Sequence, residues 1–99
     1  MSREVASQFL DSDKVWDILV AHAGANESER DDFRESWPEC HEYRFRGFLG
    51  IGGKIWNDHD TRKAPFVSFY PEDATPNRVE VRKAVNARLR ALWGKASPA

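Results

Sequence analysis

Apolar residues recur with helical and strand periods along the chain, and these two periods predict its secondary structure. The segment that precedes Gly24 has helical spacing, and Gly24 is expected to end this helix. The sequence DSD at residues 11–13 could cap a new start and divide the segment in two. The apolar positions of this first segment are Val5, Phe9, Trp16, Leu19, Val20 and Ala23.

A second, short helix is predicted to end at Trp37, before Pro38. Asn26 followed three residues later by Glu29 resembles a capping box. Phe33 and Trp37 share one face of this helix because they are four residues apart.

Strand periods dominate the middle of the chain. Alternating apolar positions from Tyr43 to Ile51 predict a half-buried strand, and a second strand is predicted to begin at Lys54. Gly52 and Gly53 lie between them and fit a two-residue hairpin turn, in which both positions favour positive φ. The sequence APFVSFY, residues 64–70, predicts a third strand.

The glycine-rich sequence RGFLGIGGKIW, residues 46–56, is superficially similar to a phosphate-binding loop. A Walker loop that ends at Gly53-Lys54 would need a glycine in place of Phe48 and a hydroxyl in place of Ile55, and a dinucleotide-binding loop would need a glycine at 55. We therefore expect Lys54 to be solvent-exposed at the start of an edge strand and not to bind phosphate.

The last predicted helix begins after Thr75, the expected N-cap, with Pro76 in its first turn. Together the elements predict an α+β fold with N-terminal helices, a three-stranded antiparallel sheet and a C-terminal helix. The 99 residues suit one domain over 1–99, with a flexible tail at 94–99. The apolar stripe of the last helix is Val81, Val85, Leu89 and Leu92.

Composition narrows the class of protein. A hydrophobic content of 40% with 12% aromatics is typical of a folded domain and argues against general disorder. One cysteine cannot form an internal disulfide, and neither a secretory signal nor a membrane-spanning segment is recognisable. The sequence therefore predicts a cytoplasmic protein.

Charge is divided unequally along the chain, although the total is only −1. Residues 1–42 carry eleven acidic and four basic residues, a net charge of −7, and residues 43–99 carry five acidic and eleven basic residues, a net charge of +6. The two halves either neutralise each other across the fold or face separate partners, because a one-signed surface steers association.

Two binding surfaces follow from this division. The acidic helix suits a protein partner with a basic surface, and its expected contacts are Asp31, Asp32, Glu35 and Glu39. The sheet face that carries Arg44, Arg46 and Phe48 combines arginine with aromatic residues, a composition common at protein interfaces and under stacked bases, unless a helix covers it. The alternative is nucleic-acid binding by the basic carboxy-terminal half, with Arg82 and Arg90 on the last helix.

Catalytic signals are weak. Cys40 and His41 are neighbours, and neighbours in a strand point to opposite faces, so they do not form a working dyad. His59 lies in a predicted polar turn, and its spacing from Cys40 and His41 matches no known metal site. We expect a non-enzymatic binding protein without a cofactor or a bound metal.

The run FRGFLGIGGKIW, with the later YPED and TPNR before the last helix, resembles small proteins of bacteriophages and prophages. The resemblance covers residues 37–92, whereas the acidic amino-terminal part has no counterpart in it. It carries no assigned activity, so no functional residue transfers. It implies a setting in which short proteins without enzymatic activity inhibit a host or defence complex, as anti-CRISPR proteins do, and occlusion of such a complex is the expected function.

Overall fold

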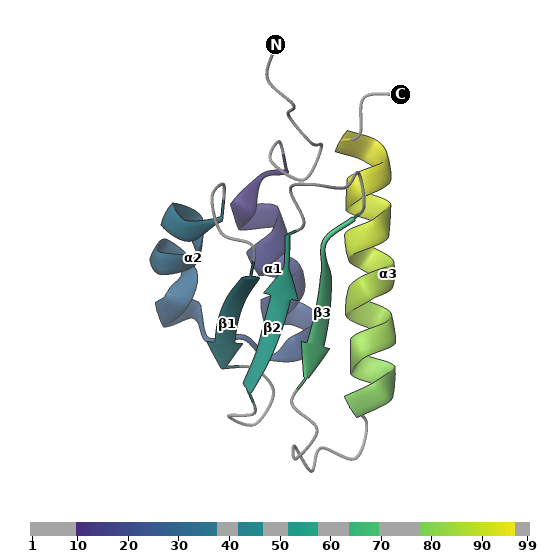
Figure 1. Cartoon of the computed structure of the whole chain (residues 1–99), viewed down its shortest axis with the longest axis horizontal. Coiled ribbons are helices and arrows are strands. Elements are labelled where there is room, and N and C mark those ends of the chain that lie inside the picture. The colour runs from purple at the N-terminus through teal and green to yellow at the C-terminus, as the bar shows by residue number, and fades with distance from the viewer. Residues whose placement is uncertain (1–9, 38–41, 47–51, 58–63, 70–77, 97–99) are drawn as a thin grey trace.

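The computed structural model describes residues 10–37, 42–46, 52–57, 64–69 and 78–96. Helices occupy one side of a three-stranded antiparallel sheet, so the predicted α+β fold is confirmed (Figure 1). The elements in chain order are α1 (Ser12–Ala23), the 3₁₀ helix η2 (Glu27–Glu29), α2 (Arg30–Ser36), β1 (Glu42–Arg46), β2 (Gly52–Trp56), β3 (Phe66–Phe69) and α3 (Arg78–Ala96).

Both ends of α1 follow the sequence signals. Asp11 is the N-cap, and its side chain accepts a hydrogen bond from the backbone N–H of Asp13 at 2.9 Å. Gly24 ends the helix with φ 67°, a conformation that side chains rarely adopt. The restart predicted at residues 11–13 is therefore confirmed, while Val5 and Phe9 lie outside the described residues.

The second helix begins differently from the predicted capping box. The Asn26 side chain caps η2 by accepting from the Ser28 N–H at 3.0 Å. Glu29 does not reach back to Asn26; its Oε2 atom accepts a hydrogen bond from the backbone N–H of Arg46 at 3.2 Å. Glu29 thus connects the second helical segment to β1.

The sheet has the order β1-β2-β3, and its register places both glycines inside the ladder. Gly53 pairs with Phe45, and Gly52 pairs with Arg46. A turn at these two positions would instead have paired Ile51 with Lys54, so the predicted hairpin turn is wrong. The chain reverses between Arg46 and Gly52, in the segment 47–51 that lies outside the described residues.

Gly53 has a packing role in the central strand. A Cβ atom at this position would lie 2.9 Å from Cζ of Phe45 and 2.9 Å from Cδ1 of Phe69. The two rings belong to its cross-strand partners on either side, and they meet edge to face with centroids 6.3 Å apart. Glycine is required here because the rings close over the backbone.

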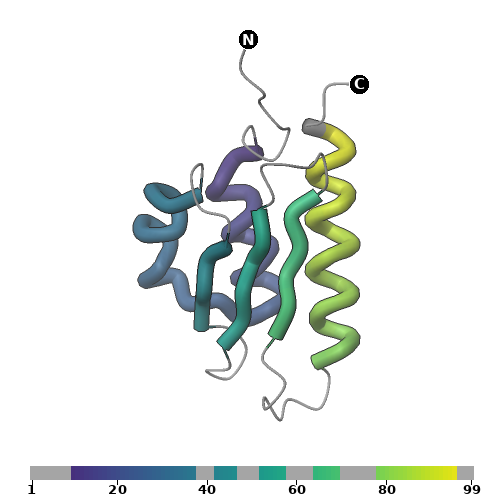
Figure 2. The backbone as a smooth tube through the Cα atoms, in the orientation of Figure 1, coloured from purple at the N-terminus to yellow at the C-terminus, as the bar shows by residue number. Residues whose placement is uncertain are grey.

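The core lies between α1 and the helix-facing side of the sheet (Figure 2). Trp16 of α1 is fully buried, 4.8 Å from the Phe33 ring of α2 and 6.0 and 6.3 Å from the rings of Tyr43 and Phe45 in β1. Phe33 and Trp37 are in contact, with ring centroids 5.2 Å apart, as their spacing predicts. Aromatic packing therefore joins both amino-terminal helices to β1.

Helix α3 packs along β3 and α1. Val85 and Leu89 are buried and Val81 and Leu92 are partly buried, so the predicted apolar stripe is confirmed. The helix continues through Gly94 to Ala96, into the segment expected to form the tail. Its expected start at Thr75 and Pro76 lies outside the described residues.

Asn86 of α3 binds the outer edge of β3. Its Oδ1 atom accepts from the Val67 N–H at 2.7 Å, and its Nδ2 atom donates to the Val67 carbonyl oxygen at 3.3 Å. β3 is at the end of the sheet, so these backbone groups have no strand to pair with. The side-chain amide satisfies both groups.

Replacing Gly53 by valine is expected to lower the free energy of unfolding by roughly 1–3 kcal/mol, because the new side chain must displace the Phe45 and Phe69 rings. Gly94→Ala is the matched control: nothing lies within 4 Å of its added Cβ, so it should raise stability by about 0.5–1 kcal/mol. Urea denaturation measures both. In a Phe69→Ala background the cost of Gly53→Val should fall, and an unchanged cost would contradict this packing role.

Candidate functional site

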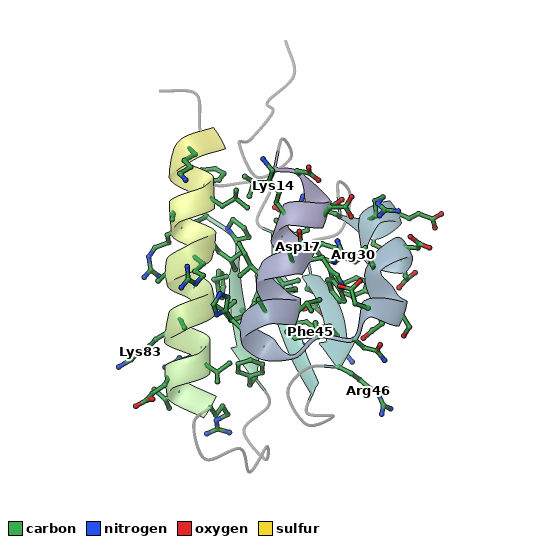
Figure 3. All side chains as sticks on the ribbon, turned by 180° about the vertical axis from the view of Figure 1, so that it is seen from behind. Lys14, Asp17, Arg30, Phe45, Arg46 and Lys83 are labelled. Atoms are coloured by element: carbon green, nitrogen blue, oxygen red, sulfur yellow. The ribbon has the colours of Figure 1, made fainter. Side chains whose placement is uncertain are left out.

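Two arginines of α2 bind the carboxylates of α1 and η2. Arg30 lies between the two helices and contacts Asp17 and Glu27 at 2.6 Å and Asp13 at 3.3 Å (Figure 3). Arg34 contacts Asp13 at 2.9 Å and Asp31 at 2.8 Å. We call this set the arginine–carboxylate cluster; its members are Asp13, Asp17, Glu27, Arg30, Asp31 and Arg34.

Hydrogen bonds within the cluster shift its pKa values. The Arg34 guanidinium, and after it Arg30, lowers the pKa of Asp13 below its ordinary value of 3.8. Arg30 likewise lowers the pKa of Glu27 below 4.5. The pKa values of the arginines are raised, chiefly by Glu27 for Arg30 and by Asp13 for Arg34. Both arginines therefore stay charged, and Asp13 and Glu27 stay ionised, at neutral pH.

The other predicted acidic contacts have different environments. Asp32 accepts a hydrogen bond from the Tyr43 hydroxyl at 2.7 Å, which ties α2 to β1. Asp31 is a cluster member, yet its side chain is 89% exposed. Glu35 is exposed and, among the described residues, has no intramolecular partner. Glu39 lies outside the described residues.

The sheet face turned away from the helices is the second candidate surface. No described helix crosses this face, which is turned to the viewer in Figure 1. Alternation and cross-strand pairing place Arg44 and Arg46 on it, as predicted, whereas Phe48 lies outside the described residues. We call it the open sheet face; its described members are Glu42, Arg44, Arg46, Gly52, Lys54, Trp56, Phe66 and Ser68.

Lys54 differs from its prediction. It lies in the central strand, and its side chain is only 22% exposed. The ammonium group is 5.3 Å from the centroid of the Trp56 ring and 3.7 Å from a Glu42 oxygen. The prediction of an exposed lysine on an edge strand is wrong because the strand order depends on β3, which pairs with β2 from the other side.

The exposed side of α3 carries most of the remaining basic charge. The described part of this helix has six basic residues and one acidic residue. Five of the six form no ion pair with any described residue: Arg82, Lys83, Arg88, Arg90 and Lys95. Lys83 points away from the rest of the molecule (Figure 3). Within the described structure, these five side chains therefore form a basic surface that no carboxylate neutralises.

Arg82 and Arg90 are each four residues from Asn86 and share its helix face. Because Asn86 binds the edge of β3, this face lies against the sheet edge. An open cavity of about 250 Å³ adjoins it, lined by Ser68, Phe69, Arg78, Val79 and Arg82. Arg82 and Arg90, the two arginines predicted to bind nucleic acid, therefore lie beside the β3 edge of the sheet.

The acidic and basic helices lie on opposite sides of the molecule. In Figure 1, α2 flanks the β1 side of the sheet and α3 flanks the β3 side, with α1 behind the strands. Residues 10–37 have a net charge of −5 and residues 78–96 a net charge of +5. The charge division of the sequence left two alternatives, neutralisation across the fold or two separate charged surfaces. The arrangement agrees with separate acidic and basic poles, and Arg30 and Arg34 partly neutralise the acidic pole.

Among the described residues, no group of three or more His, Cys, Asp or Glu side chains could hold a metal ion. The same part of the chain contains no helix long and apolar enough to cross a bilayer. Cys40, His41 and His59 lie outside it. The chain matches no protein-family profile, no curated protein and no solved structure, so the function is argued from these surfaces.

Replacing Arg30 by glutamine is expected to lower the melting temperature by roughly 5 °C at pH 7, because the link between α1 and η2 is lost. A carboxyl group with a lowered folded pKa stabilises the fold above its unfolded pKa, and this stabilisation disappears as the pH falls through the folded value. The difference from wild type should therefore close between pH 5 and about pH 2.

Lys14→Gln is the control for this prediction, since it removes the same charge from the exposed side of α1 without touching the cluster. Differential scanning calorimetry at each pH measures both variants. A difference between Arg30→Gln and wild type that is the same at pH 7 and pH 2 would contradict an electrostatic role for the cluster.

Proposed function

We propose that the chain is a non-enzymatic nucleic-acid-binding module that uses the open sheet face and the adjoining side of α3. The observation that carries the proposal is the set of five α3 cations without an ion-pair partner among the described residues. Neutralising phosphates with such side chains releases counterions, and this release drives sequence-independent binding.

The partners of the carboxylates explain why the basic pole is favoured over the acidic one. In residues 10–37, Glu35 is the one carboxylate that makes no contact within the described structure. The others cap a helix, bind Arg30 or Arg34, accept from Tyr43 or accept from the backbone of Arg46. Within residues 10–37 the acidic side chains therefore serve the fold, whereas Arg82, Lys83, Arg88, Arg90 and Lys95 form no ion pair with a described residue.

The acidic pole does not oppose this function. It lies on the β1 side, while α3 lies on the β3 side (Figure 1). Exposed charges separated by more than about 8 Å are largely screened at physiological ionic strength. A phosphate backbone that lies along α3 and the front of the sheet therefore meets mainly Arg82, Arg90 and the cations of β1 and β2.

Replacing Arg82 or Arg90 by glutamine is expected to weaken binding of a labelled oligonucleotide and to reduce the slope of log K against log salt by about 1 each. Fluorescence anisotropy across a salt series measures both quantities. Lys14→Gln is the charge-matched control on α1. Absence of binding at micromolar protein and low salt, or an equal effect of Lys14→Gln, would refute the proposal.

A second candidate is binding of a protein partner with a basic surface by the acidic side of α2. It is favoured by the exposure of Asp31 and by Glu35, which has no partner in the described structure. The sequence resemblance to small phage proteins gives this candidate its setting, occlusion of a host or defence complex. Arg44 and Arg46 would then extend the contact onto the open sheet face.

Glu35→Lys tests the second candidate without disturbing the fold, because this side chain makes no intramolecular contact in the described structure. We expect a protein captured from bacterial lysate at low salt to be lost at high salt and with Glu35→Lys, since both changes remove electrostatic attraction. Arg88→Gln is the control on the opposite pole. Capture that survives Glu35→Lys would exclude an electrostatic contact at α2.

A further inference from the structure

We infer that the open sheet face binds single-stranded nucleic acid by stacking bases on Trp56 and Phe66. This inference rests on the proposed function and names the class of nucleic acid that the surface accepts. It starts from the two rings, which are cross-strand partners on β2 and β3.

The two rings are stacked nearly parallel to each other. Their centroids are 6.1 Å apart and their planes differ by only 16°. The indole N–H of Trp56 donates to Oγ of Ser68 at 3.2 Å, which fixes the orientation of the ring. Phe66 is 46% exposed, although a phenylalanine is ordinarily buried. An aromatic pair held in place, with Phe66 open to solvent, is suited to stacking against a flat ligand.

Cations border this aromatic pair on both sides. Lys54 lies over the Trp56 ring, and Arg44, its cross-strand partner, projects from β1 on the same face. On the other side, α3 runs opposite to β3: Arg82 adjoins Ser68 and Phe69, and Asn86 binds Val67. Arg90, one helical turn further, therefore extends toward the Phe66 end. Bases on the rings would place phosphates near these cations.

Glu42 is the one carboxylate among the described members of the open sheet face. It contacts Nε of Arg44 at 3.6 Å and Nζ of Lys54 at 3.7 Å. Both contacts are long, and the Arg44 side chain is 70% exposed, so its contact with Glu42 can exchange for one with a phosphate oxygen. Glu42 thus holds two cations on the face until a ligand arrives, and its charge opposes binding only weakly.

The geometry selects a single strand over a duplex. In a duplex the base planes are stacked on one another, so a flat sheet meets only phosphates and groove edges. A single strand can turn its bases onto aromatic rings, and the backbone then follows the cations at the margin. The open sheet face offers rings for the bases and arginines for the backbone, which is the arrangement a single strand requires.

Fluorescence anisotropy with three labelled probes of equal length tests the inference: a dT oligomer, an abasic deoxyribose-phosphate oligomer and a duplex. The abasic probe keeps the phosphates and lacks the bases. We expect the dT oligomer to bind about tenfold or more tightly than either of the others, because each stacked base adds to the phosphate attraction. An rU oligomer distinguishes RNA from DNA, and tight binding of either single strand agrees with the inference.

Phe66→Leu removes the aromatic plane and keeps an apolar side chain, and it should weaken dT binding about tenfold while leaving abasic binding unchanged. Lys14→Gln is the control, since Lys14 is exposed on α1 and belongs neither to the open sheet face nor to the cavity beside α3. Equal binding of dT and abasic probes, or no effect of Phe66→Leu on dT binding, would refute stacking while the proposed function stands. No binding of any probe at low salt would refute both.

Discussion

The packing of Trp16 against β1 and α2 is the interaction on which the rest of the structure depends. Its ring contacts Phe33, Tyr43 and Phe45, so one side chain joins α1 to both neighbouring elements. Within the described structure its indole N–H has no acceptor, which costs about 1–3 kcal/mol, and the aromatic packing must outweigh that cost. Trp16 and its partners cover one face of the sheet, and no described helix covers the opposite face.

Local signals in the sequence predicted the elements well, because their causes are local. Asp11 and Gly24 mark the two ends of α1 through contacts with residues near them in the sequence. The apolar spacing of α3 arises because one side of this helix packs on the core. The arginine–carboxylate cluster could also have been predicted: Asp13 and Asp17 have the same four-residue spacing as Arg30 and Arg34.

Register and strand order could not be predicted in the same way. Gly53 looks like a turn residue until it is known to lie between Phe45 and Phe69, and Lys54 looks like an edge residue until β3 is placed beside β2. The pairing of Trp56 with Phe66 follows from the same register, which no local pattern in the sequence indicates. The number of charged residues has a similar limit, because it does not show which arginine each carboxylate binds.

The amide of Asn86 has a consequence for self-association of the sheet. It occupies the backbone groups of Val67 that an added strand would need, so within the described sheet the β3 edge is closed at Val67 to a strand from another molecule. A sheet with two available edges can add molecules at both ends and grow into a fibre. With one edge closed, strand pairing between two copies would end at a dimer, because each copy then has no second edge to offer. A single side-chain amide thus opposes growth of the sheet through its β3 edge.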